Sequence, residues 1–203
     1  MSLFYQFLFL VLTYFIAAIP FGLVLAKACG KQDIRESGSG NIGATNVARV
    51  LGKKFGLATL ILDGLKGAIM VVIARFAFGD IRYLSVFLAL VALVAVVAHI
   101  YPIYLKFKGG KGVATTFAVL LVINPAIGLV TCAAWLIIFA ITRISAIAAL
   151  GAIGVAPLYA IYLYVNQSAL KVDILLCLLL AILIFIRHKE NILRIKAKKE
   201  NKF

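Results

Sequence analysis

The chain has few cysteines, few histidines and little negative charge. Its 203 residues include 3 cysteines, 2 histidines and 7 acidic side chains against 21 lysines and arginines. The cysteines are scattered, form no Cys-x-x-Cys pair and have no histidine cluster beside them. We therefore expect neither a disulfide framework nor a metal site, and we interpret the cysteines as small apolar packing residues. No cofactor is indicated.

Long polar stretches are also scarce. Hydrophobic residues make up 65% of the chain and the mean hydropathy is +1.11, whereas soluble domains contain roughly 45–50% apolar residues. Uncharged apolar runs recur, which predicts an all-α, polytopic integral membrane bundle. The length suits one membrane-embedded domain over residues 1–203, without an additional soluble domain.

The net charge of +14 does not indicate nucleic acid in such a protein. It is typical of cytoplasmic loops and of attraction to anionic lipid headgroups, so we expect membrane lipid as the partner. No basic region precedes the first apolar run, where Lys27 is the first charge. We therefore expect an uncleaved first span, not a removed signal peptide.

Apolar segments fall at about 3–28, 55–78, 83–103, 112–141, 144–165 and 172–186. A span needs roughly 20 residues. The fourth segment is about 30 residues long and carries Asn124-Pro125 near its middle, a pair that favours a turn.

Basic residues indicate which way the chain faces. Six lysines and arginines lie in 27–54, three in 103–112 and seven from 187 onward, whereas 79–82 and 166–172 carry one each. The positive-inside rule places the three rich regions in the cytoplasm. An even number of crossings between the last two then requires a hairpin at Asn124-Pro125. This predicts seven transmembrane helices, some short, with the N-terminus outside and the C-terminus cytoplasmic. A tilted or re-entrant fourth segment is the alternative.

Three polar stretches interrupt the apolar sequence, and the first is Ser37–Lys54 (SGSGNIGATNVARVLGKK). Its glycines allow sharp bends that can point N–H groups at an anion. Several of its side chains can form hydrogen bonds, and Arg49 can grip a phosphate bidentately. Polar residues recur at helical spacing from Thr45, so we expect that part to open the second long helix. The alternative is a capped loop with a solvated basic face. The hydrogen-bonding side chains are Ser39, Asn41, Thr45 and Asn46.

In the second stretch, Phe107–Thr116 (FKGGKGVATT), the run Gly109-Gly110-Lys111-Gly112 stands directly before an apolar segment. A glycine turn at a helix N-terminus presents unpaired N–H groups to an anion. The spacing is not that of a Walker loop. A flexible, basic interfacial turn is the alternative.

The third stretch, Arg187–Arg194 (RHKENILR), places His188 and Asn191 three residues apart, on one helix face. Most such runs are headgroup anchors, which is the alternative here. The basic tail beyond it is expected to be a solvated end attracted to lipid.

Asp63 and Lys66 are charged residues three apart inside the second apolar segment. Such residues pair or face a functional interior. We expect an internal ion pair that braces the site, with direct substrate contact as the second possibility. His99, near the cytoplasmic end of the third segment, is either a packing residue or one that orients a site residue.

The stretches GSGNIGATNVARVLGKK, HIYPIYLKFKGGKGVATT and RHKENILR together resemble the bacterial acyl-phosphate:glycerol-3-phosphate acyltransferase family (PlsY). The resemblance covers essentially the whole chain, in motif order. It implies a seven-helix enzyme of the bacterial inner membrane whose site faces the cytosol. Such an enzyme moves a fatty acyl group from acyl phosphate to the sn-1 hydroxyl of glycerol 3-phosphate. It gives lysophosphatidate and phosphate in the first step of phospholipid synthesis. No obligate protein partner is evident.

The resemblance also implies site residues. The predicted catalytic residues are Ser39, Arg49, Lys111, His188 and Asn191. We assign the last four to glycerol 3-phosphate, and the Gly38–Asn41 backbone and the Gly109–Gly112 turn to the donor phosphoryl group. The two phosphates are exchangeable in this assignment. The predicted substrate-binding residues are Gly38, Gly40, Asn41, Thr45, Asn46, Gly109, Gly110, Gly112 and Ser145.

The His-x-x-x-x-Asp motif of soluble-headed glycerol-phosphate acyltransferases is absent, since Tyr104 and Leu193 stand five residues after the two histidines. An acyl phosphate is already activated, so direct attack by the acceptor hydroxyl suffices. A substrate phosphate oxygen is the favoured proton acceptor, with His188 as the alternative base. A transporter for an organic phosphate is the competing function, and a membrane-anchored binding protein is a second. Against transport, no internal repeat is visible and the polar stretches gather at one face.

Overall fold

The computed structural model describes residues 2–30 and 33–202, in which all regular secondary structure is helical. The predicted all-α class is therefore confirmed. The chain divides into two compact units, one ending at Ala118 and one beginning at Val119. Each unit is described by itself below. The single domain over 1–203 stays a prediction.

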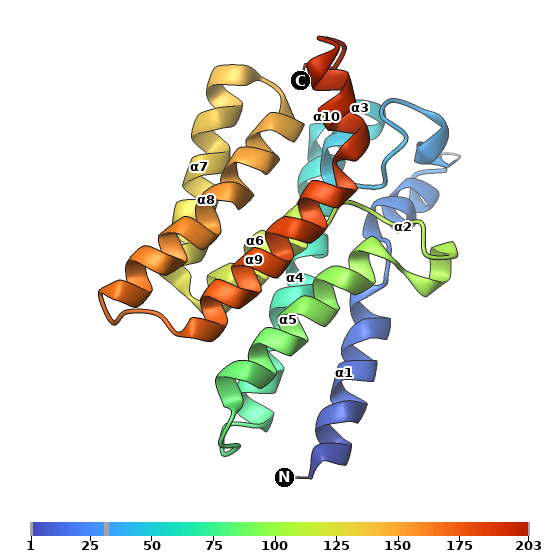
Figure 1. Cartoon of the computed structure of the whole chain (residues 1–203). Coiled ribbons are helices and arrows are strands. Elements are labelled where there is room, and N and C mark those ends of the chain that lie inside the picture. The colour runs from blue at the N-terminus through green and yellow to red at the C-terminus, as the bar shows by residue number, and fades with distance from the viewer. Residues whose placement is uncertain (1, 31–32, 203) are drawn as a thin grey trace. The chain divides into compact units, whose positions relative to one another are not determined.

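The first unit is organised around three long helices that pack against one another, α1, α4 and α5 (Figure 1). Ala17 of α1 and its neighbour Ala18 lie against Ala95 and Ala98 of α5 in a fully buried cluster. Such small side chains let two helices approach closely where lipid gives no hydrophobic drive for association. The elements of this unit are α1 (Leu3–Ala17), α2 (Phe21–Ala28), the short 3-10 helix η1 (Ile34–Glu36), α3 (Ala44–Leu51), α4 (Lys53–Ala77), α5 (Leu84–Ile100), the 3-10 helix η2 (Ile103–Leu105) and the start of α6 (Val113–Ile123).

The first apolar segment consists of two helices, where the sequence suggested a continuous run. Proline lacks the N–H that a continuing helix needs and disfavours helical geometry in the residue before it, so α1 ends ahead of Pro20 and α2 begins after it. The break leaves a carbonyl without its helical partner. Lys66 of α4 supplies the missing donor, with its Nζ 2.7 Å from the oxygen of Ile19.

The helix that begins at Ala44 does not open the second long helix, as the sequence had suggested. It ends at Leu51, and Gly52 adopts a φ of +96° before α4 begins. α3 then packs back against α4. The approach is close at Gly56, where a Cβ would lie 2.9 Å from the Cα of Ala48. Glycine at these two positions therefore allows α3 to fold against α4.

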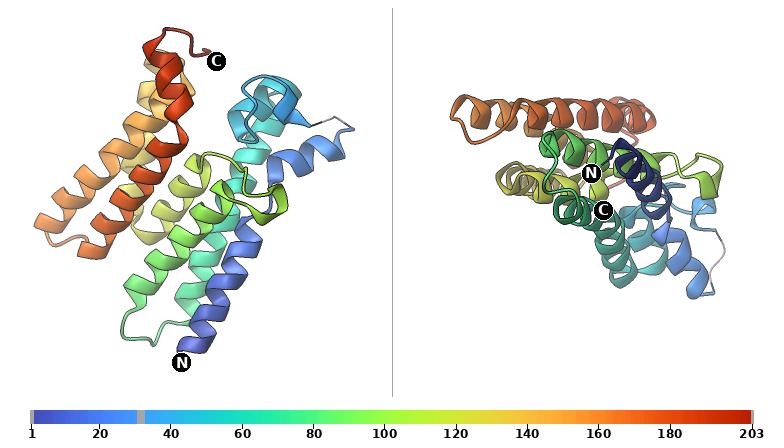
Figure 2. Two further views of the ribbon diagram at one scale, coloured as in Figure 1. Left: turned by 45° about the vertical axis from the view of Figure 1, so that its right-hand side comes forward. Right: turned by 90° about the horizontal axis from the view of Figure 1, so that it is seen from below.

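The polar stretches of this unit share one end of it. The α4–α5 turn and the N-terminus of α1 lie at one end, and α2, α3 and the segment after α5 lie at the other (Figure 2). Ala26 of α2, Ile34 of η1 and Val47 of α3 form a buried cluster that holds the first polar loop in place. The fold of this unit thus supports both polar stretches on one side.

The second unit contains α7 (Pro125–Thr142), α8 (Ser145–Val165), α9 (Lys171–Arg187) and α10 (Lys189–Lys196). α7 packs against α8, and α8 packs against α9. The predicted break at Asn124-Pro125 is confirmed. Asn124 caps α7 by accepting from the N–H of Ile127 at 3.4 Å, and Pro125 takes the first helical position, where its missing N–H costs nothing.

Five helices of the described chain are long and apolar enough to cross a membrane, namely Leu3–Ala28 with its break, Lys53–Ala77, Leu84–Leu105, Pro125–Thr142 and Ser145–Val165. α9 has 17 residues, near the lower limit for a span. α6 has 11 residues, which gives about 16 Å at 1.5 Å per residue. The seven crossings and the orientation of the termini stay predictions.

Candidate functional site

The loop between η1 and α3 is organised by the side chain of Asn46, which is 1% exposed. Its Nδ2 donates to the carbonyl oxygens of Ile34, Ser37 and Asn41 at 2.8–3.1 Å. Its Oδ1 accepts from the N–H of Ser39 at 2.7 Å. Asn46 thus shapes the loop from inside, and its assignment to substrate binding stays a prediction.

The glycines of this loop are required by its shape. Gly38 and Gly40 have φ of +65° and +69°, which side chains disfavour. A Cβ on Gly38 would also clash with Oδ1 of Asn46. The N–H of Gly40 donates to the oxygen of Ser37 at 3.2 Å. The N–H groups of Ser39 and Gly40, assigned to the donor phosphoryl group, are therefore already bonded inside the loop.

The other predicted residues of this stretch surround the loop. Ser39, Asn41 and Thr45 are half-buried, and Thr45 lies in the first turn of α3. Arg49 lies in the last turn of α3 and is also half-buried. A ligand here would be contacted by these side chains more than by the two engaged N–H groups.

A local ion pair precedes this loop. The guanidinium of Arg35 donates to both carboxylate oxygens of Asp33, with Nε at 2.8–2.9 Å. These bonds hold the pKa of Asp33 below its usual range and raise the pKa of Arg35. Because a lowered carboxyl pKa stabilises the folded state above the unfolded pKa, this contribution is present at neutral pH. It is lost as the pH falls through the lowered pKa.

The glycine turn of the second stretch folds back on the end of α5. The N–H of Gly109 donates to the oxygen of Ile100 at 3.1 Å, and that of Gly110 to the oxygen of His99 at 3.2 Å. These bonds satisfy carbonyls that the end of α5 leaves without partners. The turn therefore uses two predicted anion-binding N–H groups for its own structure.

Behind this turn lies a buried polar network. Asp63 Oδ1 lies 2.9 Å from Lys66 Nζ and 3.7 Å from His99 Nδ1, with all three side chains at most 4% exposed. The Oγ1 of Thr115 in α6 donates to the backbone oxygen of Asp63 at 2.8 Å. The predicted internal ion pair is confirmed. Because Lys66 also donates a hydrogen bond to the carbonyl oxygen of Ile19, the network connects α4, α5, α6 and the α1–α2 break.

His99 also sets the position of the glycine turn. A Cβ on Gly110 would overlap its imidazole ring at Nε2. The other ring nitrogen, Nδ1, is the one that lies near Asp63. Glycine at position 110 therefore lets the turn lie directly on the ring of His99, whose other side faces a buried carboxylate.

The N-terminus of α6 follows the turn. Gly112 has a φ of +83° and Lys111 is half-buried. Thr116, in the first turn, is fully buried, and its Oγ1 has no hydrogen-bond partner among the described residues. Thr116 belongs to the polar stretch but is not among the residues predicted from sequence. The spacing of polar residues in the sequence does not distinguish the hydroxyl of Thr116 from the others in this stretch.

In the second unit, the third stretch lies where α9 meets α10. His188 is the residue between the two helices, and it is 2% exposed. Its Nδ1 lies 2.8 Å from the oxygen of Ile184. Because a carbonyl only accepts, Nδ1 carries a proton in this contact. A backbone carbonyl thus orients the imidazole, a partner that the sequence did not reveal.

Asn191 is held by the tail of the chain. Its Nδ2 donates to Oε1 of Glu200 at 2.7 Å, and the Nε of Arg194 donates to Oε2 at 2.8 Å. Asn191 itself is 3% exposed. The expectation that everything after Arg194 is a solvated end was wrong for Glu200, which reaches back to a predicted site residue.

Ser145, the remaining predicted residue, begins α8 and is half-buried. It follows Arg143, which ends α7 in the left-handed conformation. The predicted meeting of all three polar stretches at one site involves residues of both units. It stays a prediction.

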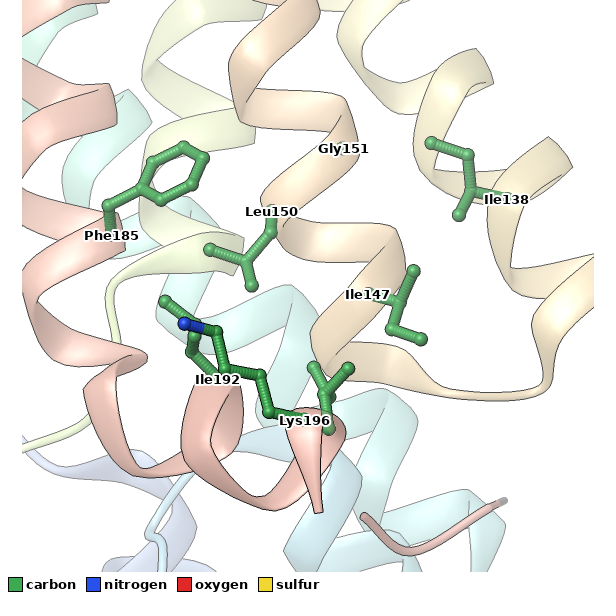
Figure 3. Close-up of a pocket in the computed structure, with 8 residues that line it drawn as sticks. Ile138, Ile147, Leu150, Gly151, Phe185, Ile192 and Lys196 are labelled. Carbon is green, nitrogen blue, oxygen red and sulfur yellow. The ribbon is translucent and has the colours of Figure 1, made fainter. Parts of the chain in front are cut away.

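An apolar pocket of about 510 Å³ lies within the second unit. Figure 3 shows the side chains of Leu150, Phe185 and Ile192 gathered around one space, with Lys196 at its edge. Its walls come from α7, α8, α9 and α10. Such a space suits an alkyl chain, with one amine near its edge.

The sequence was compared with known protein families. The model of the family described as glycerol-3-phosphate acyltransferase matches residues 7–198. The chain belongs to the glycerol-3-phosphate acyltransferase family. The predicted enzyme class is thereby confirmed over the competing transporter.

Members of the glycerol-3-phosphate acyltransferase family match this chain over most of their length. The glycerol-3-phosphate acyltransferase of Cereibacter sphaeroides is 45% identical over 91% of this chain and 83% of its own. That of Wolbachia pipientis is 42% identical over 98% of each.

Two crystal structures of PlsY (YgiH), an integral membrane glycerol 3-phosphate acyltransferase, are also similar. The glycerol 3-phosphate form has a TM-score of 0.87 at 38% identity, covering 98% of this chain and 95% of that one. The lysophosphatidic acid form has a TM-score of 0.85 at 37% identity, with the same coverage. With its apolar helices, the protein is therefore an integral membrane acyltransferase.

Proposed function

We propose that this protein transfers a fatty acyl group from acyl phosphate to the sn-1 hydroxyl of glycerol 3-phosphate, at the cytosolic face of the bacterial inner membrane. The main support is the similarity, over nearly the whole chain, to a membrane acyltransferase solved with glycerol 3-phosphate and with lysophosphatidic acid. The first molecule is the acceptor of this reaction and the second is its product.

The chemical step is a direct acyl transfer. The acceptor hydroxyl oxygen attacks the acyl carbonyl carbon, the bond from that carbon to the phosphate oxygen breaks, and phosphate leaves with the electron pair. The hydroxyl proton ends on phosphate. Because the donor is an activated mixed anhydride, positioning and stabilisation of the developing oxyanion are sufficient.

The polar residues of the first unit have the chemistry to hold phosphate. Arg49 offers a planar fork of donors and Lys111 a point charge. Ser39 adds a hydroxyl beside the loop. In the first polar loop and in the Gly109–Gly112 turn, two backbone N–H groups already form hydrogen bonds within the protein. This supports phosphate binding by the side chains and by the N-terminus of α6.

The second unit supplies His188 and Asn191. The contact between Nδ1 of His188 and the oxygen of Ile184 leaves Nε2 as the nitrogen that can accept a proton in neutral imidazole. The carbonyl of Ile184 thus orients His188 in a way that is compatible with the base role. We retain a substrate phosphate oxygen as the favoured acceptor, because it needs no transfer through the protein.

The apolar pocket of this unit is proposed to take the alkyl chain of the donor. Its lining is almost wholly aliphatic or aromatic, and α10, which carries Asn191, forms one wall. Burial of a chain there would remove apolar surface from contact with water and headgroups. An alkyl chain in this pocket would lie against the helix that carries Asn191.

The test is phosphate release by the purified protein given palmitoyl phosphate, with and without glycerol 3-phosphate. Parallel reactions offer acyl-CoA or acyl-carrier protein as the donor. Phosphate release that depends on glycerol 3-phosphate, together with lysophosphatidate formation, is the expected result. Activity with acyl-CoA alone would keep the acyltransferase but overturn the proposed donor.

A further inference from the structure

We propose that Glu200 is a positioning residue for this reaction, and that its carboxylate fixes the orientation of the Asn191 side-chain amide. The inference rests on the proposed function, in which Asn191 contacts substrate. Glu200 lies in the tail after α10, outside the three polar stretches.

The carboxylate of Glu200 contacts two side chains at once. One carboxylate oxygen of Glu200 accepts from Asn191 Nδ2 at 2.7 Å, and the other accepts from Arg194 Nε at 2.8 Å. The carboxylate is 10% exposed and Asn191 is 3% exposed. Hydrogen bonds to a charged acceptor in such a shielded place are short and strong.

The backbone brings the carboxylate there by a defined reversal. After α10 ends, Lys198 takes the left-handed conformation at φ +55°. The N–H of Lys198 donates to the oxygen of Ile195, and the N–H of Lys199 to the oxygen of Arg194 at 2.8 Å. These bonds cap the helix and turn the chain back over its last turn. This hydrogen-bonded turn therefore places Glu200 beside Asn191.

The chemistry of the two groups explains the effect. An asparagine amide has a donor arm and an acceptor arm, and a half-turn exchanges them. A carboxylate only accepts, so Glu200 favours the orientation with Nδ2 toward the tail and opposes the one that turns Oδ1 against it. The acceptor arm of Asn191 is thereby fixed on the other side of the amide. Loss of Glu200 makes both orientations accessible.

A different role for the same contact predicts the opposite sign. If the carboxylate only occupied a place that substrate phosphate must take, its removal would speed the reaction. Positioning predicts that removal slows it, because misplaced catalytic groups lower the rate steeply. The direction of the change therefore separates the two roles.

The experiment compares Glu200→Ala, Glu200→Gln and Glu190→Ala in the full chain. We expect Glu200→Ala to lower kcat about tenfold with a smaller change in KM for glycerol 3-phosphate, in protein that is somewhat less stable but still folded. Glu200→Gln keeps one acceptor oxygen for Asn191 but turns an NH2 group toward the donor of Arg194, so it should recover part of the activity. Glu190 is the matched control, because it has the same charge and lies 3.9 Å from Arg194, but its side chain is 88% exposed.

A second readout needs no turnover. In a spectrum of protein with ¹⁵N-labelled asparagine, the side-chain amide of Asn191, assigned with Asn191→Asp, should shift in Glu200→Ala and stay in place in Glu190→Ala. Equal or higher activity of Glu200→Ala, or an unchanged Asn191 amide signal, would overturn the inference. An inactive wild-type protein would instead overturn the proposed function, while the amide signal still decides on Glu200.

Discussion

Single polar side chains in this protein supply hydrogen bonds that broken helices and irregular loops lack. Asn46 bonds four backbone groups of the first polar loop, and Lys66 bonds the carbonyl of Ile19 at the α1–α2 break. Asn46 and Lys66 are both buried, so a backbone carbonyl that lost its bond to either side chain would cost about 1–3 kcal/mol. These residues are therefore expected to be sensitive to change.

Replacing Asn46 by alanine should destabilise the protein by about 2 kcal/mol or more, because buried carbonyls lose their donors. Activity should fall as well, since the loop that carries Ser39 loses its shape. Thermal unfolding in detergent measures the first effect. Asn166→Ala is the control, since that exposed amide bonds the oxygen of Tyr162 on its own helix. Equal loss in both variants would contradict the structural role of Asn46.

The buried pair Asp63–Lys66 should show strong coupling. Asp63→Ala leaves a buried ammonium without its carboxylate and should cost about 3–5 kcal/mol. In the double variant with Lys66→Met, no charge remains and much of that loss should return, less the bond to Ile19. A double-mutant cycle of unfolding measures the coupling. Additive losses would refute a direct interaction.

His188→Ala separates binding from proton transfer. If a substrate phosphate oxygen takes the proton, the variant should keep most of the turnover rate and raise KM for glycerol 3-phosphate. If turnover instead slows by roughly two orders of magnitude, His188 is the base, since general base catalysis contributes that much. Steady-state kinetics with palmitoyl phosphate distinguishes the two.

At the scale of the elements, some helix ends follow from sequence and others do not. Asn124-Pro125 is a capping residue followed by proline at the first helical position, so the break could be predicted. Pro20 lies in a continuous apolar run of span length, which hid the break there. The separation of α3 from α4 depends on the φ of Gly52 and on packing at Gly56, which helical spacing does not reveal.

The pocket between α7, α8, α9 and α10 gives a prediction about chain length. Gly151→Leu fills part of it and should raise KM for long acyl phosphates, with a smaller effect on short ones. Gly154→Leu is the matched control on the same helix, because a Cβ there meets no atom within 4 Å. Rates measured with donors of several chain lengths test this. The same chain-length profile in both variants would exclude the pocket as the acyl site.

At the scale of the whole molecule, the short helix α6 decides the topology. α6 has 11 residues and at about 16 Å covers roughly half of a 30 Å hydrocarbon core. Seven crossings require α6 to count as one of them. If it does not, the segments from Asn124 to the tail change sides.

Seven crossings place Pro125 outside and Lys199 in the cytoplasm. In a variant lacking the native cysteines, Pro125→Cys should react with a membrane-impermeant maleimide added to spheroplasts. Lys199→Cys should react only after the membrane is opened. Labelling in the reverse pattern would show that α6 is re-entrant. Asp80→Cys, in the α4–α5 turn, is expected outside in either topology because it precedes α6, and it serves as the reference.

Some of the site residues could likewise be predicted from the sequence, and others could not. Glycine, arginine and lysine in the polar stretches could be predicted because phosphate chemistry demands them. The roles of Asn46 and Glu200 could not, because each depends on a contact made by chain reversal. The orientation of His188 comes from a carbonyl, which every residue carries and no sequence pattern marks.

The buried lysine of α4 has a consequence for biosynthesis. A charged residue at the centre of a span costs about 2.5–3.5 kcal/mol on insertion, so α4 alone enters lipid reluctantly. Its partner at Ile19 leaves the ribosome before it, and Asp63 comes with it. His99 and Thr115 follow later. The growing chain can thus neutralise and cap Lys66 as it emerges, which sets an order of assembly from the N-terminus onward.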